Sequence, residues 1–134
     1  MVETRPLPRL DSINRAFWTG GADGELWIHH CNACGSYNHP PGPVCRKCLS
    51  EDVAPKAVSG EAVIDSYTVN HQAWMPGHAV PYVIARVALD DAPGVILTTN
   101  IVNCPPEAVD IGDRVRVLFE QHGEIFIPLF EKVA

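Results

Sequence analysis

Residues 31–48 read CNACGSYNHPPGPVCRKC, and this stretch decides how the first half of the chain folds. It holds two C-x-x-C pairs, Cys31 with Cys34 and Cys45 with Cys48, with ten residues between the pairs. In such an arrangement each pair forms a tight turn whose two thiolates point to one centre, and two turns together give a tetrahedral metal site. A structural disulfide and a redox-active pair are the alternatives, and the pattern favours the metal.

The sequence around the cysteines indicates a structural metal. Four thiolates fill every position of a tetrahedral ion, whereas a catalytic zinc keeps one position for water or substrate. The connection at 35–44, GSYNHPPGPV, has three prolines and two glycines and predicts a turn-rich crossover. Few large apolar residues lie between Trp27 and Leu49, so the metal would supply about 10–16 kcal/mol of apparent folding free energy. We expect zinc, with iron as the alternative, because four-sulfur sites accept either ion.

Length and composition set the class of protein. The 134 residues are 46% hydrophobic, which is enough for one domain or for two small lobes in contact. The N-terminus, MVETRPLPRL, lacks the apolar stretch of a signal peptide, and no segment approaches the ~20 apolar residues of a membrane helix. We therefore expect a cytoplasmic protein without a membrane span, in a compartment where disulfides are rare.

From residue 60 onward the sequence becomes rich in strand-forming residues. Five strands are predicted, at 62–70, 82–90, 94–102, 114–120 and 125–130. Turn sequences at 90–94 and 121–123 join two pairs of them as hairpins, and Pro128 indicates that the last strand is an edge or carries a bulge. Five short strands with one helical turn after the third predict a small OB-type barrel, and a five-stranded open sheet is the alternative.

A short N-terminal helix is predicted at 10–21, LDSINRAFWTGG. Asp11 or Ser12 would cap its start, and the two glycines at its end would stop it. Phe17 lies on its apolar face with Trp18 beside it, so this face either docks on the barrel or receives a partner. The expected fold is therefore mainly β, with an N-terminal helical segment at 1–26, a four-cysteine zinc ribbon at 27–59 and an OB-fold barrel at 60–134.

The charge distribution argues against binding to nucleic acid. The net charge is −6, and residues 60–134 carry ten acidic but four basic side chains, whereas residues 1–59 carry six of each. Zinc ribbons and OB-folds bind nucleic acids in other proteins, but that affinity comes from lysine and arginine releasing counterions from phosphates. We expect no nucleic-acid binding and keep it as an alternative function.

The loop at 71–81, HQAWMPGHAVP, carries further candidates for contact with a partner or ligand, namely His71, Trp74, Met75 and His78. The alternative is that this loop packs down as an ordinary cap of the barrel. An independent enzyme would need a histidine of this loop as base and Cys104 as nucleophile, and nothing in the sequence brings them together. A lone cysteine such as Cys104 is more often a small buried apolar residue.

The chain resembles a family in which a rubredoxin-like zinc ribbon is joined to an acyl-CoA-associated OB-fold domain. The resemblance extends from about residue 11 to residue 130. It rests on these stretches, in order: FW (17–18), CNACG (31–35), HPPGPVCRKC (39–48), SGEAVIDSYTV (59–69), PYVIARVALD (81–90), IGDRVRVLFE (111–120) and PLF (128–130). The chain departs from the family pattern at Gly42 and Arg46, and neither position is a cysteine.

This resemblance implies an accessory subunit and not an enzyme in its own right. Members of the family are similar to partners of thiolase-superfamily enzymes, including thiolases, lipid-transfer-type aldolases and hydroxymethylglutaryl-CoA synthases, or of MaoC-like enoyl-CoA hydratases. The resemblance implies a hetero-oligomer that shares an acyl-CoA thioester with its partner, including thioesters of steroid side-chain breakdown. Phe17 and Trp18, together with the four residues of loop 71–81, are then candidates for contact with the partner or the pantetheine chain. Because residues 60–134 are acidic, we expect the partner to hold most of the CoA phosphate charge.

Overall fold

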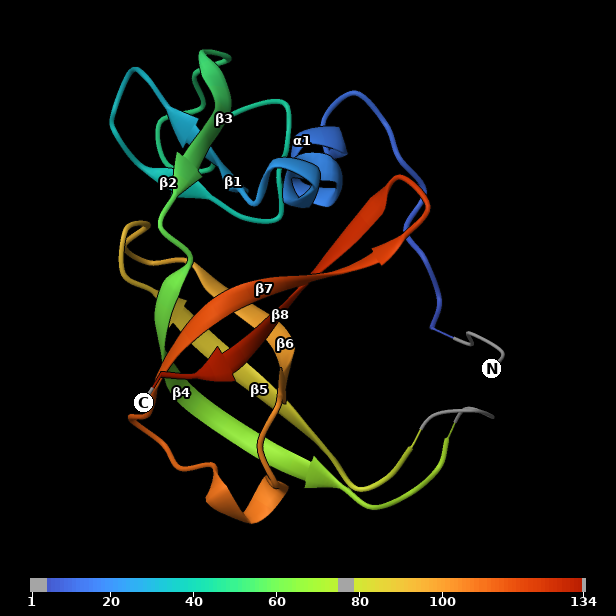
Figure 1. Cartoon of the computed structure of the whole chain (residues 1–134). Coiled ribbons are helices and arrows are strands. Elements are labelled where there is room, and N and C mark those ends of the chain that lie inside the picture. Colours follow the sequence, from blue (N-terminus) through green and yellow to red (C-terminus); the bar gives the residue numbers. More distant parts are fainter. Residues whose placement is uncertain (1–4, 75–78, 134) are drawn as a thin grey trace.

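The computed structural model describes residues 5–74 and 79–133, and its fold is mainly β (Figure 1). In chain order the elements are α1 (Arg15–Thr19), η1 (Gly20–Asp23), β1 (Leu26–Cys31), β2 (Tyr37–Asn38), β3 (Val53–Val58), β4 (Glu61–Asn70), β5 (Tyr82–Leu89), β6 (Ile96–Val102), η2 (Pro106–Ala108), β7 (Arg114–His122) and β8 (Ile125–Lys132). The first three strands form a small sheet beside α1, and the last five form a barrel. Among the residues described, no helix has the length and apolar character needed to cross a membrane.

The small sheet is antiparallel and has the order β2-β1-β3. β1 pairs with β3 along its whole length, from Leu26 opposite Val58 to Cys31 opposite Val53. β3 contains Pro55, which an edge strand accepts because its outer N–H groups have no ladder partner. This sheet is the frame that holds both cysteine pairs.

The five-stranded barrel is closed, with the order β4-β5-β6-β8-β7, and it confirms the predicted OB-type barrel over an open sheet. Neighbouring strands are antiparallel except β6 and β8, which run parallel and pair at Ile101–Phe130 and Val102–Glu131. The predicted alternation in β5 is confirmed, because the residues that point inward are the buried ones, namely Val83, Ala85, Val87 and Leu89.

β8 is not an edge strand and pairs with β7 without a register shift, so the prediction of an edge or bulged strand drawn from Pro128 is wrong. β8 lies between β6 and β7, and Pro128 is opposite Phe119 of β7. The carbonyl of Pro128 faces β6 and accepts a hydrogen bond from Thr99 Oγ1 at 3.0 Å. β6 and β8 pair only at Phe130 and Glu131 of β8, and not at Pro128. The missing N–H of Pro128 therefore removes no hydrogen bond between these two strands.

The N-terminal helix is shorter than predicted. Its N-cap is Asn14, so neither Asp11 nor Ser12 caps it. Asp11 closes a preceding turn, since its Oδ1 accepts the backbone N–H groups of Ile13 and Asn14, both at 2.8 Å. The helix ends at Gly20, as expected. Phe17 is buried in the common core and α1 contacts β8, so the apolar face of the helix docks on the barrel, while Trp18 stays partly exposed.

Gly60 joins the ribbon to the barrel and accepts no side chain. Its φ is +80°, and a Cβ atom there would lie 2.3 Å from Val117 Cγ1. The Gly60 carbonyl also accepts the Val117 N–H at 2.9 Å. The connection between β3 and β4 can therefore pass directly against β7, which fixes the ribbon close to the barrel.

Candidate metal centre and adjoining cavities

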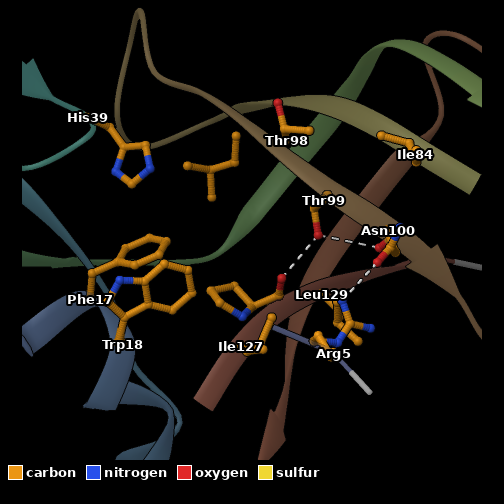
Figure 2. Close-up of a pocket in the computed structure, with 12 residues that line it drawn as sticks. Arg5, Phe17, Trp18, His39, Ile84, Thr98, Thr99, Asn100, Ile127 and Leu129 are labelled. Atoms are coloured by element: carbon orange, nitrogen blue, oxygen red, sulfur yellow. Dashed lines mark hydrogen bonds between the residues drawn. The ribbon is translucent and has the colours of Figure 1, made fainter. Parts of the chain in front are cut away.

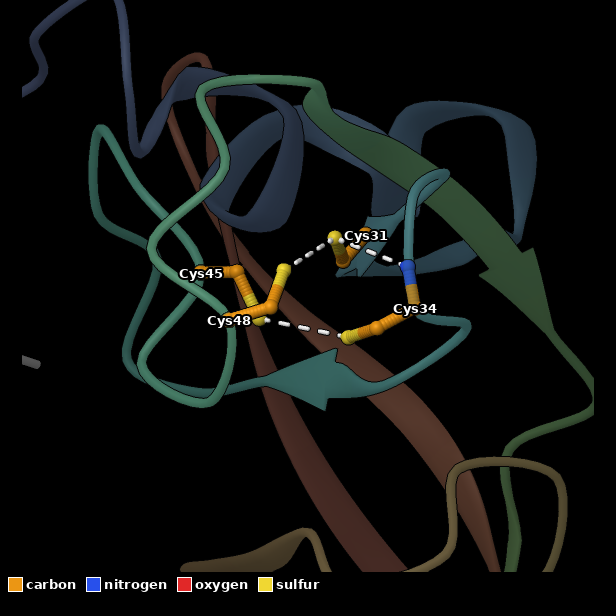
Figure 3. A group of neighbouring side chains, drawn as sticks. All are labelled: Cys31, Cys34, Cys45 and Cys48. Atoms are coloured by element: carbon orange, nitrogen blue, oxygen red, sulfur yellow. Dashed lines mark hydrogen bonds between the residues drawn. The ribbon is translucent and has the colours of Figure 1, made fainter.

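The fold brings the four predicted cysteines together (Figure 3). Their sulfur atoms all lie within 4.8 Å of one another, and Cys31 Sγ to Cys48 Sγ and Cys34 Sγ to Cys45 Sγ are both 3.6 Å apart. A tetrahedral ion with metal–sulfur bonds of about 2.3 Å has sulfur–sulfur edges of about 3.8 Å. The four sulfurs are therefore close enough to bind one metal ion after shifts of about 1 Å or less.

The two cysteine turns have the same hydrogen-bond pattern. Gly35 N donates to the Cys31 carbonyl at 2.8 Å, and Leu49 N donates to the Cys45 carbonyl at 2.9 Å. Both donors have a left-handed backbone, with φ of +79° at Gly35 and +66° at Leu49. A leucine with positive φ is uncommon, so the second turn is held in this shape by the structure around it.

Hydrogen bonds to sulfur favour the thiolate form that a metal requires. Lys47 N lies 3.3 Å from Cys45 Sγ, and Asn38 Nδ2 lies 3.6 Å from the same atom. Together with the N–H of Cys48, which has the largest effect, they lower the pKa of Cys45 to about 6. Cys34 likewise has a lowered pKa, because the hydroxyl and N–H of Ser36 favour its thiolate.

The pKa of the Cys48 thiol shows why the group of four sulfurs needs a cation. The N–H of Ser50 favours the Cys48 thiolate, but the contacts with the other three sulfurs and burial outweigh it and raise the pKa of Cys48 to about 12. Four negative charges this close repel one another unless a positive ion lies between them. The donor set therefore fits a divalent metal bound by four thiolates.

Asn38, which the sequence did not single out, and Arg46 organise the second cysteine turn. Asn38 is 6% exposed, and its Oδ1 accepts the backbone N–H of Arg46 at 2.9 Å while its amide group contacts Cys45 Sγ. The Arg46 guanidinium donates to the carbonyls of His39 and Pro40, both at 3.0 Å. Since Asn38 lies on β2, these bonds tie the turn to the sheet.

A cavity of about 260 Å³ lies where α1, the ribbon and the barrel meet (Figure 2). The rings of Phe17, Trp18 and His39 line one side, and Thr98 and Ile127 belong to the separated strands β6 and β8. A second cavity of about 350 Å³ shares the same three rings and continues along the loop at 40–43.

His39 is neutral at pH 7 and adds no charge to the aromatic side of this cavity. Burial, then the charge of Arg46 and then His29, lower its pKa to about 4. Its ring centroid is 4.7 Å from that of Phe17, and its Nδ1 is buried without a hydrogen bond to the described residues. The cavity therefore offers aromatic and aliphatic surface to a ligand.

The predicted contact residues fall into two separate groups. Trp74, which is 74% exposed, donates its indole N–H to Asn70 Oδ1 at 3.2 Å, and His71 is exposed beside it. β4 begins beside the ribbon and ends at Asn70, at the end of the barrel away from α1 (Figure 1), and Trp74 is bonded to Asn70 there. Met75 and His78 lie outside the described residues. Cys104 is partly buried against the core and does not belong to the sulfur group.

Comparison with known protein families identifies the family of this ribbon and barrel. Residues 18–54 match the rubredoxin-like zinc ribbon domain of ChsH2, and residues 55–120 match the C-terminal OB-fold domain of ChsH2. The chain therefore belongs to the ChsH2 family of a zinc ribbon joined to an OB-fold, also called DUF35. The two family models meet inside β3, which pairs with β1 of the ribbon, so the boundary expected at 59 and 60 stays a prediction.

The relatives whose names state a role are a hydratase subunit and a scaffold protein. The chain is 37% identical over 128 residues to the probable enoyl-CoA hydratase alpha subunit of Thermomonospora curvata, spanning 94% of this chain but 39% of that subunit. It is 32% identical over 96 residues to a DUF35 domain-containing scaffold protein of Methanothermobacter thermautotrophicus, covering 70% of this chain and 71% of the relative. Among solved structures, a chain of the Ltp2-ChsH2(DUF35) aldolase matches with a TM-score of 0.84 at 30% identity, covering 96% of this chain and all of that one.

Proposed function

We propose that this chain is a non-catalytic accessory subunit of an enzyme that acts on acyl-CoA thioesters, and that its partner is a lipid-transfer-type aldolase of the thiolase superfamily. The observation that carries the proposal is the likeness, over 96% of the chain, to the chain of the Ltp2-ChsH2(DUF35) aldolase. The sulfur group supports it, because four protein ligands leave no metal position for a substrate. The relative named a scaffold protein supports a structural role.

We propose zinc as the metal and Cys31, Cys34, Cys45 and Cys48 as its ligands. Zinc supplies folding free energy to a ribbon of this kind and takes no part in electron transfer. The chain's own contribution is to bring four sulfurs within 4.8 Å of one another and to direct backbone N–H groups at the sulfurs of Cys31 and Cys45. The thiols must stay reduced to bind the metal, which supports a cytoplasmic location.

We propose that the two groups of contact residues meet the partner and its thioester. Phe17 and Trp18 line an aromatic side of a cavity that is suited to an apolar ligand segment such as part of a pantetheine chain, and Arg5, which is paired with Glu120, lines the same cavity. Trp74 and His71 lie at the far end of the barrel, where an exposed indole is suited to bury itself in a protein interface, and we propose Met75 and His78, which are close by in sequence, as further contacts. The acyl-CoA would then be shared between the two subunits.

A MaoC-like enoyl-CoA hydratase is the second candidate partner. The relative from Thermomonospora curvata carries the name of a hydratase alpha subunit, and the present chain corresponds to 39% of its length. A separate hydratase polypeptide that requires this chain would favour that candidate over the aldolase.

Co-expression with a lipid-transfer-type aldolase is expected to give a complex that survives size-exclusion chromatography. Trp74→Ala is expected to weaken the complex by about thirtyfold, because truncating a buried interface tryptophan typically costs 2 kcal/mol or more. Ile111→Ala is the matched control, since Ile111 is also a large exposed apolar residue, 68% exposed, in a different loop. The aldolase eluting alone at micromolar concentrations of both proteins would contradict the proposal.

A further inference from the structure

Arg5 closes one end of the cavity beside Phe17 and Trp18. Its side chain lines the cavity and lies at the end away from the aromatic rings (Figure 2). It is carried by the segment that precedes α1, in which Pro6 and Pro8 restrict the backbone. The end wall of the cavity therefore includes one side chain of a segment that belongs to neither sheet.

Arg5 bridges two strands at the place where the wall of the barrel opens. Its Nε donates to Glu120 Oε1 on β7 at 2.8 Å, and its Nη1 donates to Asn100 Oδ1 on β6 at 3.3 Å. β8 lies between these two strands, and it pairs with β6 only at Phe130 and Glu131. The guanidinium therefore spans the place where β6 and β8 part.

This bridge can open at low cost. The side chains of Arg5 and Glu120 are 26% and 37% exposed, so water and salt screen their ion pair. Glu120 keeps a second partner when Arg5 moves, because His122 Nε2 lies 2.7 Å from the same Oε1 atom. Moving Arg5 aside therefore leaves no charge buried without compensation.

The rest of the lining suits an unbranched apolar chain. Two of its polar side chains are bonded to backbone carbonyls, since Thr99 Oγ1 donates to Pro128 at 3.0 Å and Asn100 Nδ2 donates to Val83 at 2.9 Å. Besides the aromatic rings, a ligand meets the aliphatic side chains of Ile84, Leu97, Ile127 and Leu129.

We propose that Arg5 is a gate that sets the length of the apolar chain that this cavity accepts. A chain that enters along the loop at 40–43, where the second cavity continues, passes the aromatic rings and meets Arg5 last. While Arg5 is bonded to Glu120, the chain must end there. When that bond is broken, the chain can take the space of the arginine stem. The ligand class rests on the proposed function, whereas the gate rests on the bonds of Arg5.

A purely structural bridge would behave differently. It would only join β6 to β7, and its loss would lower the free energy of unfolding without changing the chain length that fits the cavity. The free energy of unfolding must therefore be measured for every variant beside its ligand affinity.

The test is a titration of the isotope-labelled, zinc-loaded full chain with straight-chain alcohols of increasing length, followed by the amide NMR signals of Leu97 and Ile127. In the wild-type chain the Kd is expected to fall about fourfold with each added methylene, the usual gain from burying one such group, and to stop falling at the length that reaches Arg5. Arg5→Ala is expected to extend the fall by about three methylenes, the length of the arginine stem. Arg5→Lys keeps a stem and a positive charge for Glu120 and is expected to keep the stop.

Arg9→Ala is the matched control, because Arg9 is an exposed arginine of the same segment and is not among the described residues that line the cavity. The same stop in Arg5→Ala as in the wild type, no stop in the wild type, or an equal extension in Arg9→Ala would each overturn the inference. A lower free energy of unfolding in Arg5→Ala with an unchanged stop would also overturn it. If no alcohol shifted the cavity signals, the apolar ligand and the gate would both be overturned.

The gate can fail without the accessory role. The alcohol titration uses the chain without a partner, whereas co-purification with the aldolase reports the accessory role. A chain that binds the aldolase but shows no stop at Arg5 would overturn only the gate.

Discussion

Removing the metal with a chelator is expected to unfold the ribbon at residues 26–58 and to leave the barrel folded. The metal would contribute about 10–16 kcal/mol of apparent folding free energy, more than a small lobe can lose. The barrel has its own closed hydrogen-bond ladder and a buried core that includes Ile64, Val87 and Phe130. Amide NMR signals before and after treatment with a chelator, with metal content measured on the same sample, check the prediction.

Two cysteine variants separate the metal site from the rest of the chain. Cys45→Ser removes a fully buried ligand and is expected to reproduce the chelated spectrum, since three sulfurs bind the ion much less tightly. Cys104→Ser is the matched control and should retain one metal ion per chain, because Cys104 lies outside the sulfur group. Metal-free protein that keeps all its ribbon signals would contradict the structural role, and a red protein with one iron per chain would contradict zinc.

Phe130→Ala is expected to destabilise the barrel by about 3–5 kcal/mol, the usual cost of emptying a buried aromatic site. Phe130 is 0% exposed and is opposite both Ile101 of β6 and Val117 of β7. It therefore fills the core at the point where the parallel strands close the barrel. Denaturant unfolding of the zinc-loaded protein, followed by far-ultraviolet circular dichroism, measures the loss.

Phe126→Ala is the control for this variant, because Phe126 is the same residue type on the same strand but is only partly buried. We expect it to cost about 1–2 kcal/mol from the smaller apolar area that it removes from water. If the two variants lost similar free energies of unfolding, the closure of the barrel between β6 and β8 would not depend on Phe130.

Much of the fold was predictable because two of its signals are local. The cysteine spacing depends on the geometry of each turn, and the alternation in β5 follows from one buried and one less buried face. The strands β1 and β3 were not predicted. β1 contains two adjacent histidines before Cys31, and β3 contains Pro55, so neither has the pattern of an ordinary strand.

The barrel closure and the cavities depend on contacts between distant residues, and sequence patterns do not report such contacts. Pro128 indicated an edge strand because its missing N–H is a local property, whereas the separation of β6 from β8 that accommodates it is not. Likewise, Asn38 lies in a connection predicted as turn-rich, and its contact with Cys45 arises only when the two cysteine turns come together. The cavity beside Phe17 and Trp18 arises when α1 and the ribbon are placed against the barrel.

The most direct test of the accessory role is retro-aldol cleavage of the carbon–carbon bond of a β-hydroxyacyl-CoA by three samples: the zinc-loaded chain alone, the lipid-transfer-type aldolase alone, and the two together. A chain whose metal is enclosed by four sulfurs has no open metal position for a substrate, so the chain alone should cleave no acyl-CoA. We expect cleavage when both proteins are present, at a rate well above that of the aldolase alone. Turnover of the thioester by this chain in the absence of any partner would contradict the account.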